Sequence, residues 1–437
     1  MRLYILLALA FFASLLYGSY GISSASCESG AISGKQESKN EINKTKSVLQ
    51  QAIDSAKENS VINLPKGIYK GNIVIDKPIT IDGLDKGAVI LGDGDGSVIK
   101  IFASNVTLKN LTIKGSGTNH DTIDSAISAK DSFKINILDN HIEDALYGVD
   151  FEKVNMSKVE GNFITSKKGM DLGLRGDAIR LWYSNENSIA GNVIKDSRDT
   201  VFWYSSGNRI ENNIGSHCRY SLHFMYAGKN LVQNNQYDHN SVGIFFMYSS
   251  GTTAVNNTVK NSIGFGVGIG MKESSNFKIL NNTLTYNARG FYIDDSPFQP
   301  GSVNIYENNN ILYNSIGIQL HAIREKSLFY GNNFTGNMET IINDTPNSKI
   351  WLNEWNGNYF DDYEGFDRDD NKIGDIPYIN KAYADKLWLY NDSIKFFYGS
   401  PVMSILNFLA KLIPFSEPDI LLKDNSPRIK AKYNGTT

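Results

Sequence analysis

RYSLHFMYAGKNLVQNN, residues 219–235, is matched in the same frame twenty-two residues later by FFMYSSGTTAVNN, residues 245–257. Each stretch begins with alternating side chains and ends in two asparagines. Such alternation in short runs rich in Ile, Val, Phe and Tyr is typical of β-strands, and asparagine pairs are typical of turns. One strand and one turn therefore recur together, and the strand carries a histidine and methionines.

The asparagine frame extends along the middle of the chain at intervals of 21 to 30 residues, which indicates a solenoid. Leucine-rich repeats share this period, but not the Leu-poor frame. The sequence predicts an all-β, right-handed parallel β-helix of about ten coils. Coils about 4.8 Å apart would stack these asparagines in a hydrogen-bonded ladder, so the repeat is interpreted as structural. The marking residues are Asn110, Asn140, Asn162, Asn192, Asn213, Asn235, Asn257, Asn282, Asn309 and Asn332.

The N-terminus has the features of an export signal. Arg2 precedes the apolar run at residues 3–17, which is short for a membrane span, so we expect a cleaved signal peptide over residues 1–26. An uncleaved anchor and lipidation at Cys27 remain alternatives. Cys27 and Cys218 lie far apart in sequence, so we expect no disulfide framework.

Three further segments are expected after the signal peptide. Residues 44–95 contain an amphipathic helix and short strands, and are predicted to form an N-terminal cap and the first coils. Residues 96–345 hold the β-helix repeats. Residues 346–437 are predicted to form a C-terminal capping region with an acidic loop and a short helix in PVMSILNFLAKLIPF. The net charge of −3 disfavours nucleic acid as a partner.

Alignment on the asparagines assigns side chains to the two faces of one strand. The inward face is expected to carry Ile179, Thr200, Leu222, Ile244 and Ile269, and Leu181, Phe202, Phe224, Phe246 and Met271. The outward face is expected to carry Arg180, Val201, His223 and Phe245, and Trp182, Trp203, Met225 and Met247.

His223, Met225 and Met247 become near neighbours in this alignment. One imidazole and two thioethers can converge on one ion, and thioether sulfur selects Cu(I) rather than Zn or Mg. His217 and His239 hold equal offsets from their asparagines and form a second candidate copper site, or polar turn residues.

The alternative for this stripe is a docking surface without metal. Exposed aromatic and apolar side chains usually mark a partner surface, and Trp182, Trp203 and Phe245 are the predicted contact residues.

FDRDDNKIGD resembles a calcium loop, with oxygen-bearing side chains at alternate positions. It departs from an EF-hand because Tyr378 stands where a bidentate Glu is expected and Lys372 where a Gly is expected. An acidic turn without metal is the alternative. The candidate calcium ligands are Asp367, Asp369, Asn371 and Asp375.

The motifs GDAIRLWYS, RDTVFWYSSGNRIENN, RYSLHFMYAGKN, SVGIFFMYSSG, ARGFYIDDSPFQP and WNGNYFDDYEGFDRDDNKIGDIPY resemble the NosD family in order, over residues 45–425. The resemblance implies a periplasmic, non-enzymatic β-helix protein that helps to assemble the copper centre of nitrous oxide reductase. It implies an ABC-type ATPase and permease, a copper-carrying lipoprotein and the reductase itself as partners. It assigns no copper ligand in this chain.

The alternative function is a β-helix lyase, epimerase or hydrolase acting on uronate-containing sugars. Such enzymes need carboxylates on adjacent coils beside a basic partner. Asp294 and Asp295 with Arg289 are the best local candidates, and Asp177 with Arg198 is a second pair. The sequence shows no histidine that would complete an acid/base group around Asp294.

Overall fold

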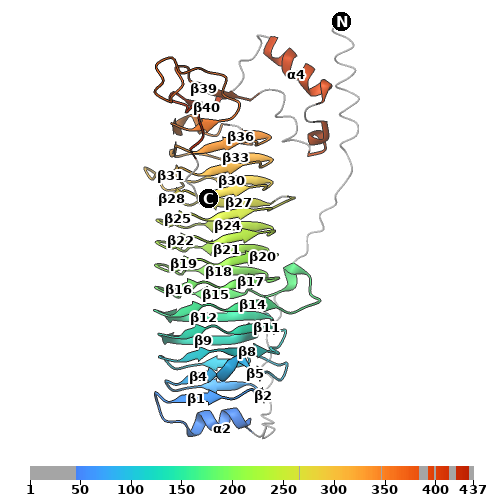
Figure 1. The fold of residues 1–437 in the computed structure, drawn as a ribbon, viewed down its shortest axis with the longest axis vertical. Helices are drawn as coiled ribbons and strands as arrows, with labels where there is room; N and C mark the ends of the chain where they lie inside the picture. Colours follow the sequence, from blue (N-terminus) through green and yellow to red (C-terminus); the bar gives the residue numbers. More distant parts are fainter. Residues whose placement is uncertain are drawn as a thin grey trace, which may run out of the picture. The chain divides into compact units, whose positions relative to one another are not determined.

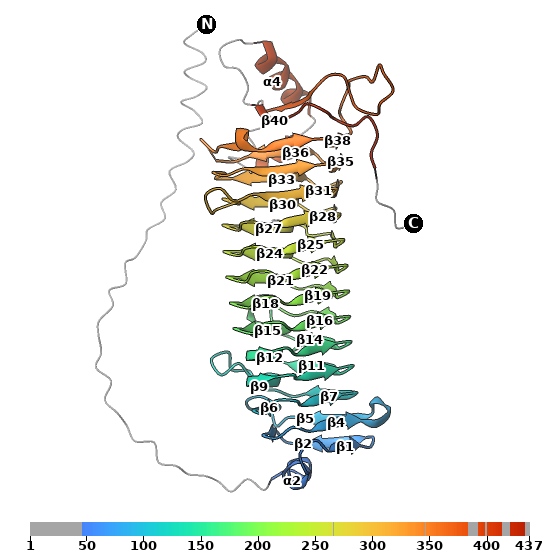
Figure 2. The same cartoon turned by 90° about the vertical axis from the view of Figure 1, so that its left-hand side faces the viewer.

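Three long sheets build the fold of this computed structural model, and all their strands pair parallel except the last two of the first sheet. The structure describes residues 46–264, 266–345, 347–382, 392–397, 400–412 and 420–432. Successive strands of the chain pass from one sheet to the next, so each turn of the coil contributes one strand to each sheet. Figures 1 and 2 show the resulting stack of coils. The predicted β-helix is confirmed, with about thirteen turns rather than ten, because turns without a marking asparagine add to the count.

Each sheet is ordered along the stack. The first consists of β1 (Val61–Leu64), β4 (Thr80–Gly83), β7 (Thr107–Lys109), β10 (Asn136–Leu138), β13 (Lys158–Glu160), β16 (Ser188–Ala190), β19 (Arg209–Glu211), β22 (Leu231–Gln233), β25 (Thr253–Val255), β28 (Lys278–Leu280), β31 (Asn304–Glu307), β34 (Ser327–Tyr330), β37 (Glu354–Asn356), β40 (Ile420–Asp424) and β39 (Tyr378–Lys381). The second consists of β2 (Gly67–Lys70), β5 (Ala88–Leu91), β8 (Leu111–Lys114), β11 (His141–Ala145), β14 (Phe163–Ser166), β17 (Val193–Lys195), β20 (Ile214–Ser216), β23 (Gln236–Asp238), β26 (Thr258–Lys260), β29 (Thr283–Thr285), β32 (Asn310–Leu312), β35 (Asn333–Thr335) and β38 (Tyr359–Phe360). The third consists of β3 (Ile73–Ile75), β6 (Ile99–Ile101), β9 (Ser125–Phe133), β12 (Tyr147–Asn155), β15 (Ile179–Trp182), β18 (Asp199–Trp203), β21 (Tyr220–Met225), β24 (Val242–Met247), β27 (Val267–Lys272), β30 (Arg289–Asp294), β33 (Ile316–His321) and β36 (Glu339–Asn343).

The asparagine ladder runs through the turn between the first and second sheets. Asn235 is typical: its Oδ1 accepts the Asn213 backbone N–H at 2.9 Å, and its Nδ2 donates to the Ile210 carbonyl at 2.9 Å and to Asn257 Oδ1 at 2.9 Å. The residue before it, Asn234, has φ 56°. That left-handed conformation suits Gly, Asn or Asp, which explains why the frame places these residues before each marker.

Two ladder positions differ from the sequence alignment. Asn110 occupies the left-handed position, with φ 57°, and Leu111 takes the ladder position, where its N–H donates to Asn140 Oδ1. At the other end the ladder continues past residue 345 to Asn358, and the Asp424 carboxylate accepts its N–H and side-chain amide. The other nine marking asparagines lie in the ladder as predicted, each almost fully buried.

Both predicted inward columns lie in the core. Every member is at most 2% exposed. Phe202, Phe224 and Phe246 stack along the axis, with ring centroids 4.8 to 5.0 Å apart, and Phe277 packs against Phe246 at 4.8 Å with its ring tilted by 57°. The spacing of the coils therefore also sets the spacing of the aromatic core.

Helix α2 (Val48–Ser55) lies at the first coil and buries Leu49 and Ile53, as a solenoid cap requires. Its N-cap is Ser47, whose Oγ accepts the Gln50 N–H at 3.1 Å. The predicted C-terminal helix is present as α4 (Pro401–Leu412). The short 3-10 helices are η1 (Leu84–Lys86), η2 (Leu172–Leu174), η3 (Ile350–Leu352) and η5 (Asp392–Phe397).

The predicted signal peptide and Cys27 lie outside the described residues. Among the described helices, none has both the length and the apolar character needed to cross a membrane.

Candidate functional site

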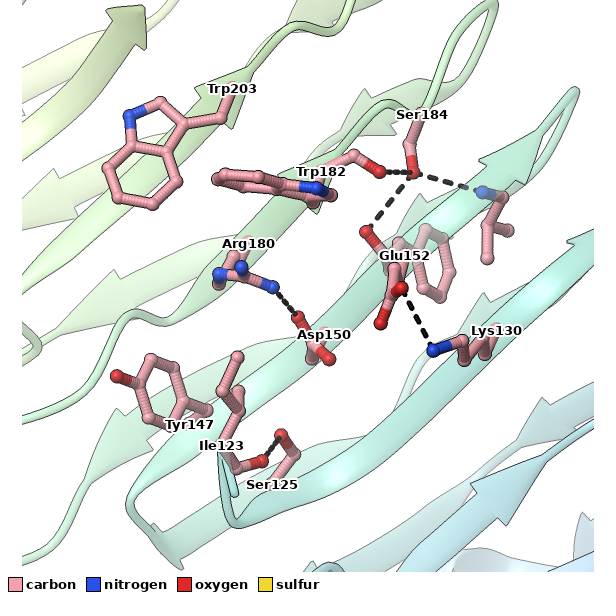
Figure 3. A network of polar contacts seen from close by, with 12 residues as sticks. Ile123, Ser125, Lys130, Tyr147, Asp150, Glu152, Arg180, Trp182, Ser184 and Trp203 are labelled. Carbon is pink, nitrogen blue, oxygen red and sulfur yellow. Dashed lines mark hydrogen bonds and ion pairs between the residues drawn. The ribbon is translucent and has the colours of Figure 1, made fainter. Parts of the chain in front are cut away.

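The outer face of the third sheet carries the two columns predicted from the sequence. Strand pairing aligns Trp182 with Trp203, Trp203 with Met225, and Met225 with Met247. The indole rings of Trp182 and Trp203 meet edge to face, 5.0 Å apart (Figure 3). These four side chains are half-buried, so the expected exposed stripe is corrected to a partly sheltered one.

Phe245 lies on the same face but is only 8% exposed. Its ring covers Gly270, where a Cβ would approach the ring atoms to 2.4 Å, and it packs near Tyr220. The exposed aromatic surface comes instead from the neighbouring turn. There the rings of Tyr183, Tyr204, Tyr226 and Tyr248 stack 4.8 to 5.1 Å apart.

His223 contacts one of the two predicted methionines. Its Nε2 lies 3.3 Å from Met247 Sδ, and its Nδ1 lies 3.4 Å from Asp199 Oδ2. The histidine side chain is 12% exposed. Met225 is the strand partner of Met247, so an imidazole and two thioethers gather on adjacent coils. A soft ion can bind here only when Nε2 of His223 carries no proton and Nδ1 carries one. The Asp199 carboxylate beside Nδ1 favours this tautomer.

Asp199 is the residue that sequence reasoning missed at this site. It is 3% exposed, and Arg219 Nε donates to its Oδ1 at 2.9 Å. Burial alone would raise the pKa of Asp199, but the hydrogen bonds from His223 and Arg219 and the charge of Arg219 outweigh burial and lower that pKa. The carboxylate therefore stays ionised beside the imidazole.

Arg–Asp pairs continue this face toward the N-terminal coils. Arg180 Nη1 donates to Asp150 Oδ1 at 2.6 Å and lies 5.1 Å from the ring of Trp182 (Figure 3). The Asp177–Arg198 pair expected from the sequence is present, with Arg198 Nε donating at 2.9 Å. Burial raises the pKa of Asp177 to about 6, against the opposing charge of Arg198.

His217 and His239 stack as predicted, with ring centroids 5.7 Å apart and the planes within 10°. Both backbones are left-handed, with φ 57° and 54°, which fits turn residues. His239 Nδ1 lies 2.6 Å from Asp238 Oδ1. Cys218, next to His217, points inward, and burial raises the pKa of its thiol to about 12. It is therefore a buried core thiol that stays protonated at neutral pH.

The predicted calcium loop is closed by its own hydrogen bonds. Asp367 accepts the backbone N–H groups of Asn371 and Lys372 at 3.0 and 2.8 Å. Asn371 Nδ2 donates to Asp369 Oδ2 at 2.9 Å, and Asp375 Oδ2 accepts the Arg368 N–H at 2.8 Å. These bonds orient carboxylates within one turn, so calcium binding stays a prediction.

Asp369→Ala is expected to lower the melting temperature by on the order of a few degrees when Ca²⁺ is present, and to have no effect when it is absent. The reason is that an ion bound only by the folded chain adds stability in proportion to its occupancy. Thermal unfolding of both proteins with Ca²⁺ and with chelator measures this. A wild-type melting temperature that is unchanged by chelator would leave the loop an acidic turn.

The expectation that Asp294 has no histidine near it is wrong. Asp294 and His321 are direct strand partners on adjacent coils, and His321 Nδ1 lies 2.7 Å from Asp344 Oδ1. The cation that pairs with Asp295 is Arg324. The loop between β30 and β31 lengthens this coil, so the fixed offset from the asparagine did not reveal the histidine.

In the described part of the chain, no three His, Cys, Asp or Glu side chains are arranged to hold one metal ion. The His223, Met225 and Met247 group has one side chain of these four types, and its other two donors are softer thioether sulfurs.

A family model described as "Periplasmic copper-binding protein (NosD)" matches residues 167–365, which include this whole face from β15 to β36. A protein of Stutzerimonas stutzeri, "Probable ABC transporter binding protein NosD", is 29% identical over 390 residues, covering 84% of this chain and 86% of its own. The chain is therefore similar to NosD proteins along most of its length. A Pseudomonas aeruginosa protein of the same name is 29% identical over 80% of this chain and 84% of its own. These NosD relatives are named as binding proteins and not as enzymes.

Solved structures resemble this chain in fold alone. The A-module of the mannuronan C-5 epimerase AlgE6 from Azotobacter vinelandii has a TM-score of 0.54 and 15% identity, over 71% of this chain and 93% of its own. The surface adhesin PfbA of Streptococcus pneumoniae has a TM-score of 0.51 and 12% identity, over 69% and 89%. One is an enzyme and the other an adhesin, so the fold does not decide the function.

Proposed function

We propose that this chain is a periplasmic accessory protein that binds and relays copper during assembly of the copper centre of nitrous oxide reductase. The observation that carries the proposal is the contact between His223 Nε2 and Met247 Sδ, with Met225 as the neighbouring thioether. The family model's description as periplasmic and copper-binding supports the same cargo and compartment.

The donor set favours Cu(I). Thioether sulfur is a soft ligand, needs no deprotonation and discriminates against Mg²⁺ and Ca²⁺. Asp199 holds the imidazole from its Nδ1 side, so Nε2 faces the sulfur. Trp203, the half-buried strand partner of Met225, would limit the access of water to one side of this group and so protect a weakly held ion.

Cu(I) titration of the purified protein, with metal counting and a competing chelator, tests the proposal. We expect one Cu(I) per chain, bound in mildly acidic as well as neutral solution, because thioethers carry no proton to lose. A chain that binds no Cu(I) at micromolar concentration would contradict the relay.

A membrane transporter is the partner that best fits the surface of α4. This helix exposes large apolar side chains to 38–62%, on a segment too short to span a bilayer. Exposed apolar surface of this kind normally meets another apolar surface. The name "ABC transporter binding protein" of the relatives supports a permease as that surface. The exposed side chains are those of Val402, Ile405, Leu406, Phe408, Leu409 and Leu412.

Phe408→Glu is expected to weaken binding to the permease at least tenfold without changing the fold. Phe408 is 60% exposed, so a carboxylate is tolerated in the free protein but is desolvated in an apolar interface. Co-purification with the detergent-solubilised transporter measures the loss. Ile263→Glu is the matched control, because Ile263 is 72% exposed on a coil of the repeat region. Equal binding by the two variants would move the docking site away from α4.

The sugar-enzyme alternative retains one specific observation, the carboxylates of Asp294 and Asp344 around His321. Burial raises the pKa of the adjacent Tyr292 to about 12, and this argues against the phenol of Tyr292 as a catalytic base. Release of unsaturated products from polyuronate, in the absence of copper binding, would favour this alternative over the relay.

A further inference from the structure

A second group of titratable side chains lies on the outer face of the third sheet, apart from the His223 group. Strand pairing places Met247, Lys272, Asp294 and His321 in one column on β24, β27, β30 and β33. Three coil steps of about 4.8 Å separate Met247 from His321, or ~14 Å. The two groups are therefore distinct, but they face the same side.

Within the described part of the chain, the hydrogen-bond partners of His321 all lie at its Nδ1. Its Nδ1 lies 2.7 Å from Asp344 Oδ1 and 2.9 Å from Thr345 Oγ1, and its side chain is 40% exposed. A carboxylate that accepts the Nδ1 proton fixes the tautomer and leaves Nε2 as the ligand nitrogen. Asp344 thus lies beside the Nδ1 of His321, as Asp199 lies beside the Nδ1 of His223.

Asp294, on the adjacent coil, supplies an oxygen donor. Its carboxylate is 14% exposed and lies 3.7 Å from Lys272 Nζ. Burial raises the pKa of Asp294, against the opposing charges of His321 and Lys272. A neighbouring cation stabilises the charged form of a partly desolvated carboxylate. Lys272 is such a cation, but at 3.7 Å it stabilises the carboxylate only weakly.

Gln319 adds an independent sign of an incomplete polar site. It is 8% exposed, and its Nε2 donates to Asp344 Oδ2 at 2.5 Å. Its buried Oε1 has no hydrogen-bond partner among the described residues. A buried amide oxygen without a donor is unfavourable, and a water bound to an ion would supply one.

We propose that His321 Nε2 and the Asp294 carboxylate bind a Cu(II) ion at a second site, harder than the His223, Met225 and Met247 group. An imidazole with a carboxylate suits Cu(II), which is bound most tightly of the first-row divalent ions. Only two protein ligands are used, so water or a partner's side chain completes the shell and the ion can leave. The choice of copper rests on the proposed function, whereas the site itself rests on the geometry.

Titration of the purified protein with Cu²⁺ alone, followed by electron paramagnetic resonance, tests the site. We expect a copper signal with nitrogen coupling, lost in His321→Gln with at least a tenfold weaker affinity. Lys272→Gln is the decisive variant, because removing the competing cation beside Asp294 should tighten Cu²⁺ about tenfold. A merely structural role for this group gives no such gain.

His141→Gln is the matched control, because His141 also lies next to a carboxylate, that of Glu143, and should leave the signal unchanged. Unchanged affinity in both His321→Gln and Lys272→Gln, or loss of the signal in His141→Gln, would overturn the site. Met225→Leu with Met247→Leu should leave Cu²⁺ binding intact. Failure of Cu(I) binding in the parent protein would contradict the relay and leave this Cu²⁺ result standing.

Discussion

Replacing Met225 and Met247 together by leucine is expected to weaken Cu(I) binding at least tenfold, or about 1.4 kcal/mol, while the fold is preserved. Leucine matches methionine in volume and apolarity, and such exchanges usually change stability by less than about 1.5 kcal/mol. What is lost is the sulfur that faces His223 Nε2 at 3.3 Å and its neighbour on the next strand. Competition titration measures the affinity, and the copper content of the co-expressed reductase measures maturation, which we expect to fall.

Two controls separate metal binding from docking. Met156→Leu removes an exposed thioether elsewhere and should change neither quantity. Trp203→Ala removes the indole beside Met225 and should weaken partner binding more than Cu(I) binding. If the double leucine variant binds copper and supports maturation like the parent, while Trp203→Ala abolishes partner binding, the outer face is a docking surface only.

Asn235→Ala is expected to destabilise the coil stack by about 3 to 5 kcal/mol, because several buried hydrogen bonds depend on this one amide. The substitution leaves the Asn213 backbone N–H without its partner in a fully buried turn, and the Ile210 carbonyl loses the side-chain amide that donates to it. Each unsatisfied buried group costs about 1 to 3 kcal/mol. It also interrupts the amide ladder to Asn257. The midpoint of urea unfolding, followed by circular dichroism, measures the loss.

The adjacent asparagine gives the matched control for this prediction. Asn234 has φ 56° and uses its left-handed backbone rather than a buried amide, so Asn234→Gly should change stability by no more than about 0.5 kcal/mol. Equal effects of Asn235→Ala and Asn234→Gly would mean that the ladder amides contribute little. The stack would then depend on the aromatic core alone.

The coil architecture and the assignment of faces follow from the sequence because one period links them. Once Asn213, Asn235 and Asn257 are aligned, strand alternation places every residue between them inside or outside. This is why the pairing of Met225 with Met247 and the burial of Phe224 were predictable. The exposure of each outward residue was not, because it depends on what its neighbours on other coils cover, as Phe245 shows over Gly270.

The alignment also could not predict which polar side chains contact the histidines. A register shift between Asp199 and Val201 brings the Asp199 carboxylate toward His223, and such a bulge leaves no mark in a fixed offset. Asp344 reaches His321 from the next coil, near the end of the repeat region. Both partners act across coils, where distance depends on local bulges and loop length and not on the period.

The ladder that passes from Asn140 to Asn358 and ends on Asp424 also makes the molecule divisible into whole coils. Because each coil bonds only to its two neighbours, evolution or an engineer can insert or delete one without disturbing the contacts of the others. The unit between Asn192 and Asn213 is the shortest of the marked intervals, and duplicating it would move the Asn192 coil and Asp424 apart by one axial step of about 4.8 Å. The number of coils in the solenoid then sets the distance between its outer-face groups and whatever the C-terminal end contacts.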